Sequence, residues 1–163
     1  MIPNEYSYSR IVEPVNTFIK REYDYALRIC AYLAGKFGQG LVPISRLSRS
    51  LLISRPFTTK IVYRLKNEKI ITTVQGKDGG VYLSRSPDTT TIYDVLFAMG
   101  FDSKLNECLA DGHQCPMEEI CRLHSFFEQQ ENLLLKHFKN KKLSDVIMTD
   151  DELKSSVRQS LNL

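Results

Sequence analysis

The chain has 163 residues, of which 42% are hydrophobic and 25% charged, enough for one folded domain with an appendage and a core that needs no disulfides. No stretch is long and apolar enough to span a bilayer, and the start, MIPNEYSYSR, lacks a secretory signal pattern, so we expect a cytoplasmic protein without membrane contact. The net charge is +3, but it is unevenly distributed. The segment from Arg46 to Arg85 holds nine Lys/Arg and two acidic residues, whereas the rest of the chain holds thirteen Lys/Arg and seventeen acidic residues.

The chain begins with a predicted extension and a first helix. Residues 1–16 are polar, contain two prolines and show no regular period, so we interpret them as an extension. From Glu22 to about Phe37 apolar residues recur at helical spacing, and Gly38 is expected to end that helix. Its apolar stripe consists of Ala26, Ile29, Cys30 and Leu33. We therefore predict that Cys30 is a small core residue and not a ligand.

Two further helices are predicted next. Pro43 opens a short one over residues 44–53, and Ser54 is a plausible N-cap for a third, with a proline in its first turn. The buried seam of the third helix is predicted at steps of four through Phe57, Ile61 and Leu65. An ordinary amphipathic helix would show the same seam.

A β-hairpin follows, because the period changes at residues 70–74 and 81–83 and the linker QGKDGG supplies glycines for a tight turn. This order predicts a mainly α fold with a small β-hairpin wing, a winged helix–turn–helix, whose third helix enters the major groove of double-stranded DNA. The basic charge supports that reading, although a solvated face with scattered lysines gives the same count. The residues expected at DNA are Arg46, Arg55, Thr58, Thr59, Lys60, Tyr63, Arg64, Gln75 and Lys77.

The C-terminal half is predicted to contain a fourth helix at residues 90–99 and a long helix from about Pro116. The long helix carries an apolar stripe that one small domain cannot cover, so we expect a homodimer. KLSDVI is expected to fold back before an acidic and polar tail. The predicted divisions are 1–16 (extension), 17–100 (winged domain), 101–125 (cysteine loop and helix start), 116–148 (dimerisation helix) and 149–163 (tail).

Three of the four cysteines lie between Cys108 and His124, with the spacing Cys108-x6-Cys115-x5-Cys121-x2-His124. Thiolates are soft ligands for zinc and iron–sulfur clusters, and Cys121 and His124 share one helix face. Zinc pairs are usually closer in sequence, so the spacing favours an iron–sulfur cluster over zinc or unliganded thiols. Three thiolates leave one ligand open, for His124, His113, a carboxylate or an exogenous group.

Several motifs, in this order and spacing, resemble the Rrf-type family of bacterial winged-helix transcription regulators. They are Asp24-Tyr25-Ala26-Leu27-Arg28, the wing Gly76-Lys77-Asp78-Gly79-Gly80, Asp94-Val95, the three clustered cysteines, and Leu143-Ser144-Asp145-Val146. The resemblance runs from about Tyr23 to Ile147. It implies a homodimer with crossed long helices, an iron–sulfur cluster beside them, and a pseudo-palindromic DNA operator.

The family's three cysteine ligands carry over to Cys108, Cys115 and Cys121, with a first gap one residue longer than the commonest family spacing. Two residues compete for the fourth position. His124 has the spacing of the histidine that completes a 2Fe–2S site in the family's iron–sulfur cluster assembly regulator. Asp24 matches an aspartate that, in the nitric-oxide-sensing repressor, reaches a 4Fe–4S cluster of the other subunit. The DYALR context favours Asp24.

The sequence thus predicts a dimeric transcription regulator, not an enzyme, whose operator affinity is set by an iron–sulfur cluster. Thr59 stands where the assembly regulator has an acidic base-reading residue, and Gln75 stands at its wing arginine position, so the operator sequence does not carry over. The first alternative is a winged-helix protein with a structural zinc ion. The second is a thiol redox enzyme or electron carrier, which the absence of a Cys-x-x-Cys pair disfavours.

Overall fold

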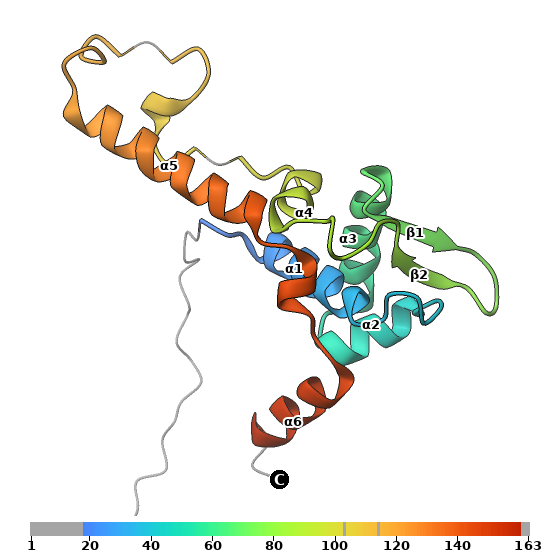
Figure 1. The fold of residues 1–163 in the computed structure, drawn as a ribbon. Coiled ribbons are helices and arrows are strands. Elements are labelled where there is room, and N and C mark those ends of the chain that lie inside the picture. Colours follow the sequence, from blue (N-terminus) through green and yellow to red (C-terminus); the bar gives the residue numbers. More distant parts are fainter. Residues whose placement is uncertain (1–17, 103, 114, 161–163) are drawn as a thin grey trace, which may run out of the picture.

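The computed structural model describes residues 18–102, 104–113 and 115–160, so the predicted extension at 1–16 lies outside the described residues. Helices dominate, and two antiparallel strands form a hairpin at one side (Figure 1). This confirms the predicted mainly α fold with a β-hairpin wing. In chain order the elements are α1 (Arg21–Ala34), α2 (Ile44–Leu51), α3 (Arg55–Asn67), β1 (Ile71–Val74), β2 (Gly80–Leu83), α4 (Ile92–Ala98), the 3-10 turn η1 (Glu107–Leu109), α5 (Arg122–Asn140), the 3-10 turn η2 (Leu143–Val146) and α6 (Asp150–Ser160).

The turn between α2 and α3 is tight because its residues satisfy the end of α2. Leu52 adopts a left-handed conformation with φ of 54° and sends the chain away from the helix axis. The Ser48 hydroxyl then donates a hydrogen bond to the Ile53 carbonyl at 2.6 Å. Leu47 and Leu51 bury the inner face of α2 against α3. The pair forms the predicted helix–turn–helix.

The wing is a regular hairpin in which Ile71 pairs with Leu83 and Val74 with Gly80. Only part of the predicted glycine chemistry is right. Gly76 has the expected positive φ of 117°. Gly80 is needed for a different reason: a Cβ atom there would lie 2.7 Å from the Val42 carbonyl oxygen, so the close approach of the two backbone segments requires glycine. That approach places the chain just before α2 beside the wing.

The core lies between α1, α2, α3, α4 and the inner face of the hairpin. Cys30 is fully buried there, as predicted, and burial raises the pKa of its thiol far above the ordinary value. Leu143 is also fully buried, because η2 folds back against α1. The predicted return of KLSDVI is therefore confirmed.

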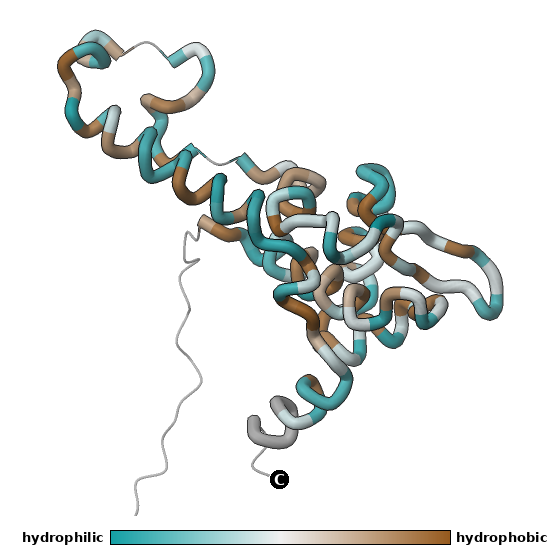
Figure 2. Tube along the Cα trace, viewed as in Figure 1, coloured by the Kyte–Doolittle hydropathy of each residue, from teal (hydrophilic) through white to brown (hydrophobic). Residues whose placement is uncertain are grey.

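The long helix begins later than predicted. Residues 117–120 form turns, Cys121 is the N-cap residue, and α5 starts at Arg122 instead of near Pro116. From its packed end against α4 the helix extends away from the body, with the cysteine loop at its far end (Figure 1). Hydrophobic residues recur along its length (Figure 2), and three large ones are more than half exposed in the single chain: Leu123, Phe126 and Leu133.

The polar tail is not an irregular appendage, because residues 150–160 form α6. Glu152 accepts hydrogen bonds from the backbone N–H of Thr149, at 2.8 Å, and from its hydroxyl, while the Glu152 N–H donates back to that hydroxyl. This reciprocal capping box starts the helix. Among the described residues, none of the helices combines the length and hydropathy of a bilayer-crossing segment.

Candidate DNA-binding surface and cysteine site

A groove of about 500 Å³ runs between α3 and the wing, with the start of α2 at its edge. Lys66 also lines it, which sequence reasoning missed although Thr59, Tyr63 and Lys66 are spaced to share one helix face. The charged residues among those that line it, Arg55, Lys66 and Lys77, are all positive. Five of the residues expected at DNA meet here: Arg55, Thr59, Tyr63, Gln75 and Lys77.

Two of the expected DNA contacts are corrected by the packing of α3. Thr58 is fully buried and donates its hydroxyl to the Ser54 carbonyl at 3.0 Å, because it lies on the seam with Ile61 and Leu65. The Arg64 guanidinium donates to Glu22 at 3.2 Å and to the Met99 carbonyl, on the side of α3 that faces α1 and α4. Both residues therefore serve the fold and do not face the groove.

The remaining two expected contacts lie outside the lining of the groove. Lys60 is exposed on the first half of α3, with its ammonium 6.0 Å from the centre of the Phe57 ring. Arg46 lies on α2 and is bound by its own chain, since its guanidinium donates to Asp150 at 2.7 Å and to the Tyr32 hydroxyl at 3.1 Å.

The three clustered cysteines are free and half-buried, on a loop that folds back along α5. Cys108 lies in η1, which packs on α5, and Cys121 occupies the N-cap position of the same helix without a side-chain capping hydrogen bond. Within residues 18–102, 104–113 and 115–160, however, no three His, Cys, Asp or Glu side chains are arranged to hold a metal ion. The single chain thus brings the ligand types to one loop without closing a site around them.

His124, in the first turn of α5, is the histidine best placed beside that loop. It lines an open cleft of about 1000 Å³ together with Cys115, Glu118 and Glu128. Its Nε2 is 3.8 Å from a Glu118 carboxylate oxygen, and its Nδ1 is buried with no hydrogen-bond partner among the described residues. An unpartnered buried nitrogen is costly and indicates a missing partner. His113, the other candidate histidine, is exposed.

Asp24 lies far from this cleft in the single chain, because α1 is packed in the body and the cysteine loop is at the distal end of α5 (Figure 1). Its carboxylate forms an ion pair with Arg28, one turn along α1, at 2.9 Å. Any role of Asp24 at the cysteine loop therefore requires a second chain.

Glu131 is a functional candidate that sequence reasoning missed. Its carboxylate, on α5, is only 8% exposed and accepts a hydrogen bond from the Leu105 N–H at 3.1 Å. Lys104 approaches the same carboxylate at 3.6 Å. This contact fixes the chain just before η1 and Cys108. The sequence contained a signal for this role, because Glu131 is an acidic residue within an apolar stripe, one helical turn beyond Phe127.

Together, the helix–turn–helix, the basic groove against the wing and the cysteine loop beside a protruding helix define a winged-helix DNA-binding protein. The family model described as Rrf2, iron-dependent transcriptional regulator, matches residues 19–149. The chain belongs to the Rrf2 family and is a DNA-binding transcription regulator.

Relatives agree with this family, and solved structures share its fold. The transcriptional regulator NsrR of Bacillus licheniformis is 29% identical over 132 residues, covering 80% of this chain and 92% of the relative. NsrR of Halalkalibacterium halodurans is 26% identical over 136 residues, with coverages of 83% and 93%. CymR, the global cysteine regulator of B. subtilis, shares the fold with a TM-score of 0.65, 20% identity and coverages of 78% and 93%. IscR of T. potens shares it with a TM-score of 0.60, 16% identity and coverages of 87% and 89%.

Proposed function

We propose that this regulator holds an iron–sulfur cluster through Cys108, Cys115 and Cys121 and that the cluster sets its affinity for DNA. The observation that carries the proposal is the cleft that Cys115 and His124 both line, with an unpartnered Nδ1 on His124 and three free thiols on the adjoining loop. The donor set fits because thiolates and imidazole are ligands of such clusters. When bound, the cluster supplies a centre that oxidation, nitric oxide or iron shortage can destroy.

The chain offers a physical link between the loop and the DNA-binding surface. Cys121 is the N-cap of α5, so a change in its position acts directly on that helix. At the other end of α5, the Phe138 ring lies 6.0 Å from that of Phe101, which lies 5.7 Å from that of Tyr23 on α1. Ligation can shift DNA affinity only as far as it favours one arrangement of these helices over another.

A homodimer is part of the proposal. Leu123, Phe126 and Leu133 project from α5 while more than half exposed, on a helix that packs on its own chain mainly near one end. A second copy that crosses α5 would cover these side chains. Two winged domains related by a twofold axis then fit a pseudo-palindromic operator.

The direct test is anaerobic purification followed by iron, acid-labile sulfide and absorbance analysis. We expect a brown protein that contains both iron and sulfide. A structural zinc ion is the second candidate, because the imidazole of His124 and the carboxylates of Glu118 and Glu128, which line the same cleft, are ligand types that zinc also accepts. A colourless preparation with stoichiometric zinc and no sulfide would establish that candidate and reject the cluster.

We propose His124 as the fourth ligand, in preference to Asp24, because His124 has a buried free nitrogen whereas Asp24 is paired with Arg28. His124→Ala is expected to change the visible spectrum and shorten the lifetime of the anaerobic cluster. His137→Ala, which removes an exposed imidazole from the same helix, should change neither. If Asp24→Asn alters the spectrum and His124→Ala does not, the ligand comes from the partner subunit.

Lys77 lines the groove and Arg64 does not, so we expect different roles for these two basic residues. Lys77→Ala is expected to weaken binding to all DNA sequences alike and to lower the salt slope by about one unit, as loss of one phosphate contact does. Arg64→Ala should leave that slope unchanged and lower the melting temperature, because it breaks the contacts with Glu22 and Met99. Salt titrations and thermal melts check both. A reduced slope in Arg64→Ala would return that residue to the DNA surface.

A further inference from the structure

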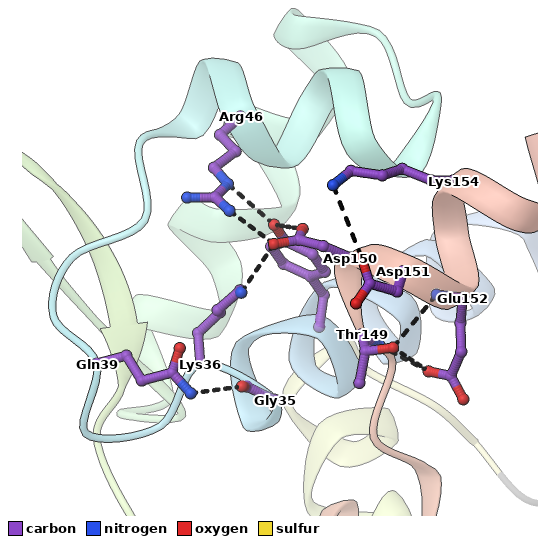
Figure 3. Close-up of polar contacts among 10 residues, drawn as sticks. Gly35, Lys36, Gln39, Arg46, Thr149, Asp150, Asp151, Glu152 and Lys154 are labelled. Atoms are coloured by element: carbon purple, nitrogen blue, oxygen red, sulfur yellow. Dashed lines mark hydrogen bonds and ion pairs between the residues drawn. The ribbon is translucent and has the colours of Figure 1, made fainter.

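The N-terminal end of α6 is bound by three donors that meet at one carboxylate: one at the end of α1, one just after α1 and one on α2. Asp150 accepts hydrogen bonds from the Tyr32 hydroxyl at 2.6 Å, the Lys36 ammonium at 2.8 Å and the Arg46 guanidinium at 2.7 Å (Figure 3). The hydrogen bonds from Lys36 and Tyr32, with the positive charge of Arg46, hold the pKa of Asp150 far below its usual range. The carboxylate therefore stays charged in this contact.

The three donors form an anion site that is anchored on one core residue, Tyr32. Tyr32 is fully buried, and its hydroxyl also accepts a hydrogen bond from the Arg46 Nε at 3.1 Å. The Lys36 ammonium lies 6.0 Å from the centre of the Tyr32 ring. Two cations and one hydroxyl thus converge on a single position. Such a set suits a phosphate oxygen as well as a carboxylate oxygen.

This anion site borders the DNA-binding groove. Pro43, Ile44 and Ser45 line the groove with residues of α3 and the wing, and Arg46 is the next residue of α2. In helix–turn–helix proteins the first helix of the pair crosses the DNA backbone. A backbone phosphate is therefore the external anion that this position would meet.

We propose that the site formed by Tyr32, Lys36 and Arg46 binds a phosphate of the DNA backbone, and that Asp150 occupies it in the free protein. The C-terminal helix then competes with DNA. Asp151 and Glu152 add two further negative charges to the first turn of α6 and oppose the approach of phosphate. The family match ends at residue 149, so the competing carboxylate lies just beyond the matched segment. This proposal requires DNA binding but no cluster.

The test compares Asp150→Asn with Asp151→Asn in the full chain, using a short mixed-sequence duplex across a range of salt concentrations. Both variants remove one negative charge from the same helical turn. The Asp151 side chain, however, is 97% exposed, and among the described residues its ion pair is with Lys154, at 3.7 Å. We expect Asp150→Asn to bind several-fold more tightly at low salt, with a slope steeper by about one unit for the added phosphate contact. Asp151→Asn should keep the original slope.

The double variant Arg46→Ala/Asp150→Asn should lose part of the gain, because it removes one of the two cations of the released site. Asparagine keeps an acceptor oxygen for Tyr32, and thermal melts verify that each variant is folded. Equal slopes for the two single variants would overturn the proposal. Weaker binding by folded Asp150→Asn would also overturn it, since Asp150 would then be positioning Arg46 for DNA. Neither result affects the iron and sulfide test.

Discussion

Replacing any one of Cys108, Cys115 or Cys121 by alanine is expected to remove the iron and sulfide of the anaerobic protein and to bleach its visible absorbance. A cluster needs several thiolates at once, so loss of one of three leaves too few ligands. The fold should survive, because these cysteines lie on the distal loop and not in the core. Iron, sulfide and absorbance measurements, with far-ultraviolet circular dichroism for the fold, check the result.

Cys30→Ala is the matched control. Cys30 is fully buried in α1, so its removal is expected to lower stability slightly and to leave iron and sulfide content unchanged. Retention of a full cluster in any of the three loop variants would exclude that cysteine from the ligand set. Bleaching by Cys30→Ala in a folded protein would place the cluster elsewhere.

A charge on the exposed face of α5 is expected to convert the dimer into monomers and to abolish tight operator binding. Leu133→Glu and Phe126→Glu each place two carboxylates, one from each copy, in the interface that we propose. Truncating a hot-spot residue of an interface costs about 2 kcal/mol or more, and a buried unpaired charge costs further. Size-exclusion chromatography with light scattering and analytical ultracentrifugation measure the oligomeric state.

Phe97→Glu provides the control, because Phe97 is 62% exposed but lies on α4. It should remain dimeric. If Phe97→Glu dissociates the dimer and the α5 variants do not, the interface is on the other helix. If the unaltered chain is monomeric at micromolar concentration even with its cluster, the proposed homodimer is wrong.

The sequence predicted those features that depend on local periodicity and on strong turn signals. The hairpin follows from two strand-like segments around a glycine-rich turn, and the burial of Cys30 follows from its place in an apolar stripe. The capping box that starts α6 was also readable, since Thr149 and Glu152 have the required spacing, yet the polar composition led to the prediction of a tail.

Other features depend on contacts between residues distant in sequence. Arg64 is turned from the groove by Glu22, which lies 42 positions earlier, and Arg46 is bound by Asp150, which lies 104 positions later. The start of α5 was misplaced because MEEI continues a helical pattern in composition while the chain forms turns there. Among the described residues the clustered thiols are not arranged around one centre, and that arrangement depends on the path of the loop, which local sequence patterns do not encode.

The most direct test of the central claim compares DNA affinity of the same anaerobic preparation before and after removal of its cluster. The duplex is one selected by the protein from a random pool, and salt concentration is held constant. We expect the two affinities to differ by roughly 5- to 150-fold, the usual range of coupling between two sites. The apo protein reloaded with iron and sulfide should regain the original affinity. Equal affinities of the cluster-bound and apo proteins, both folded and dimeric, would contradict control by the cluster.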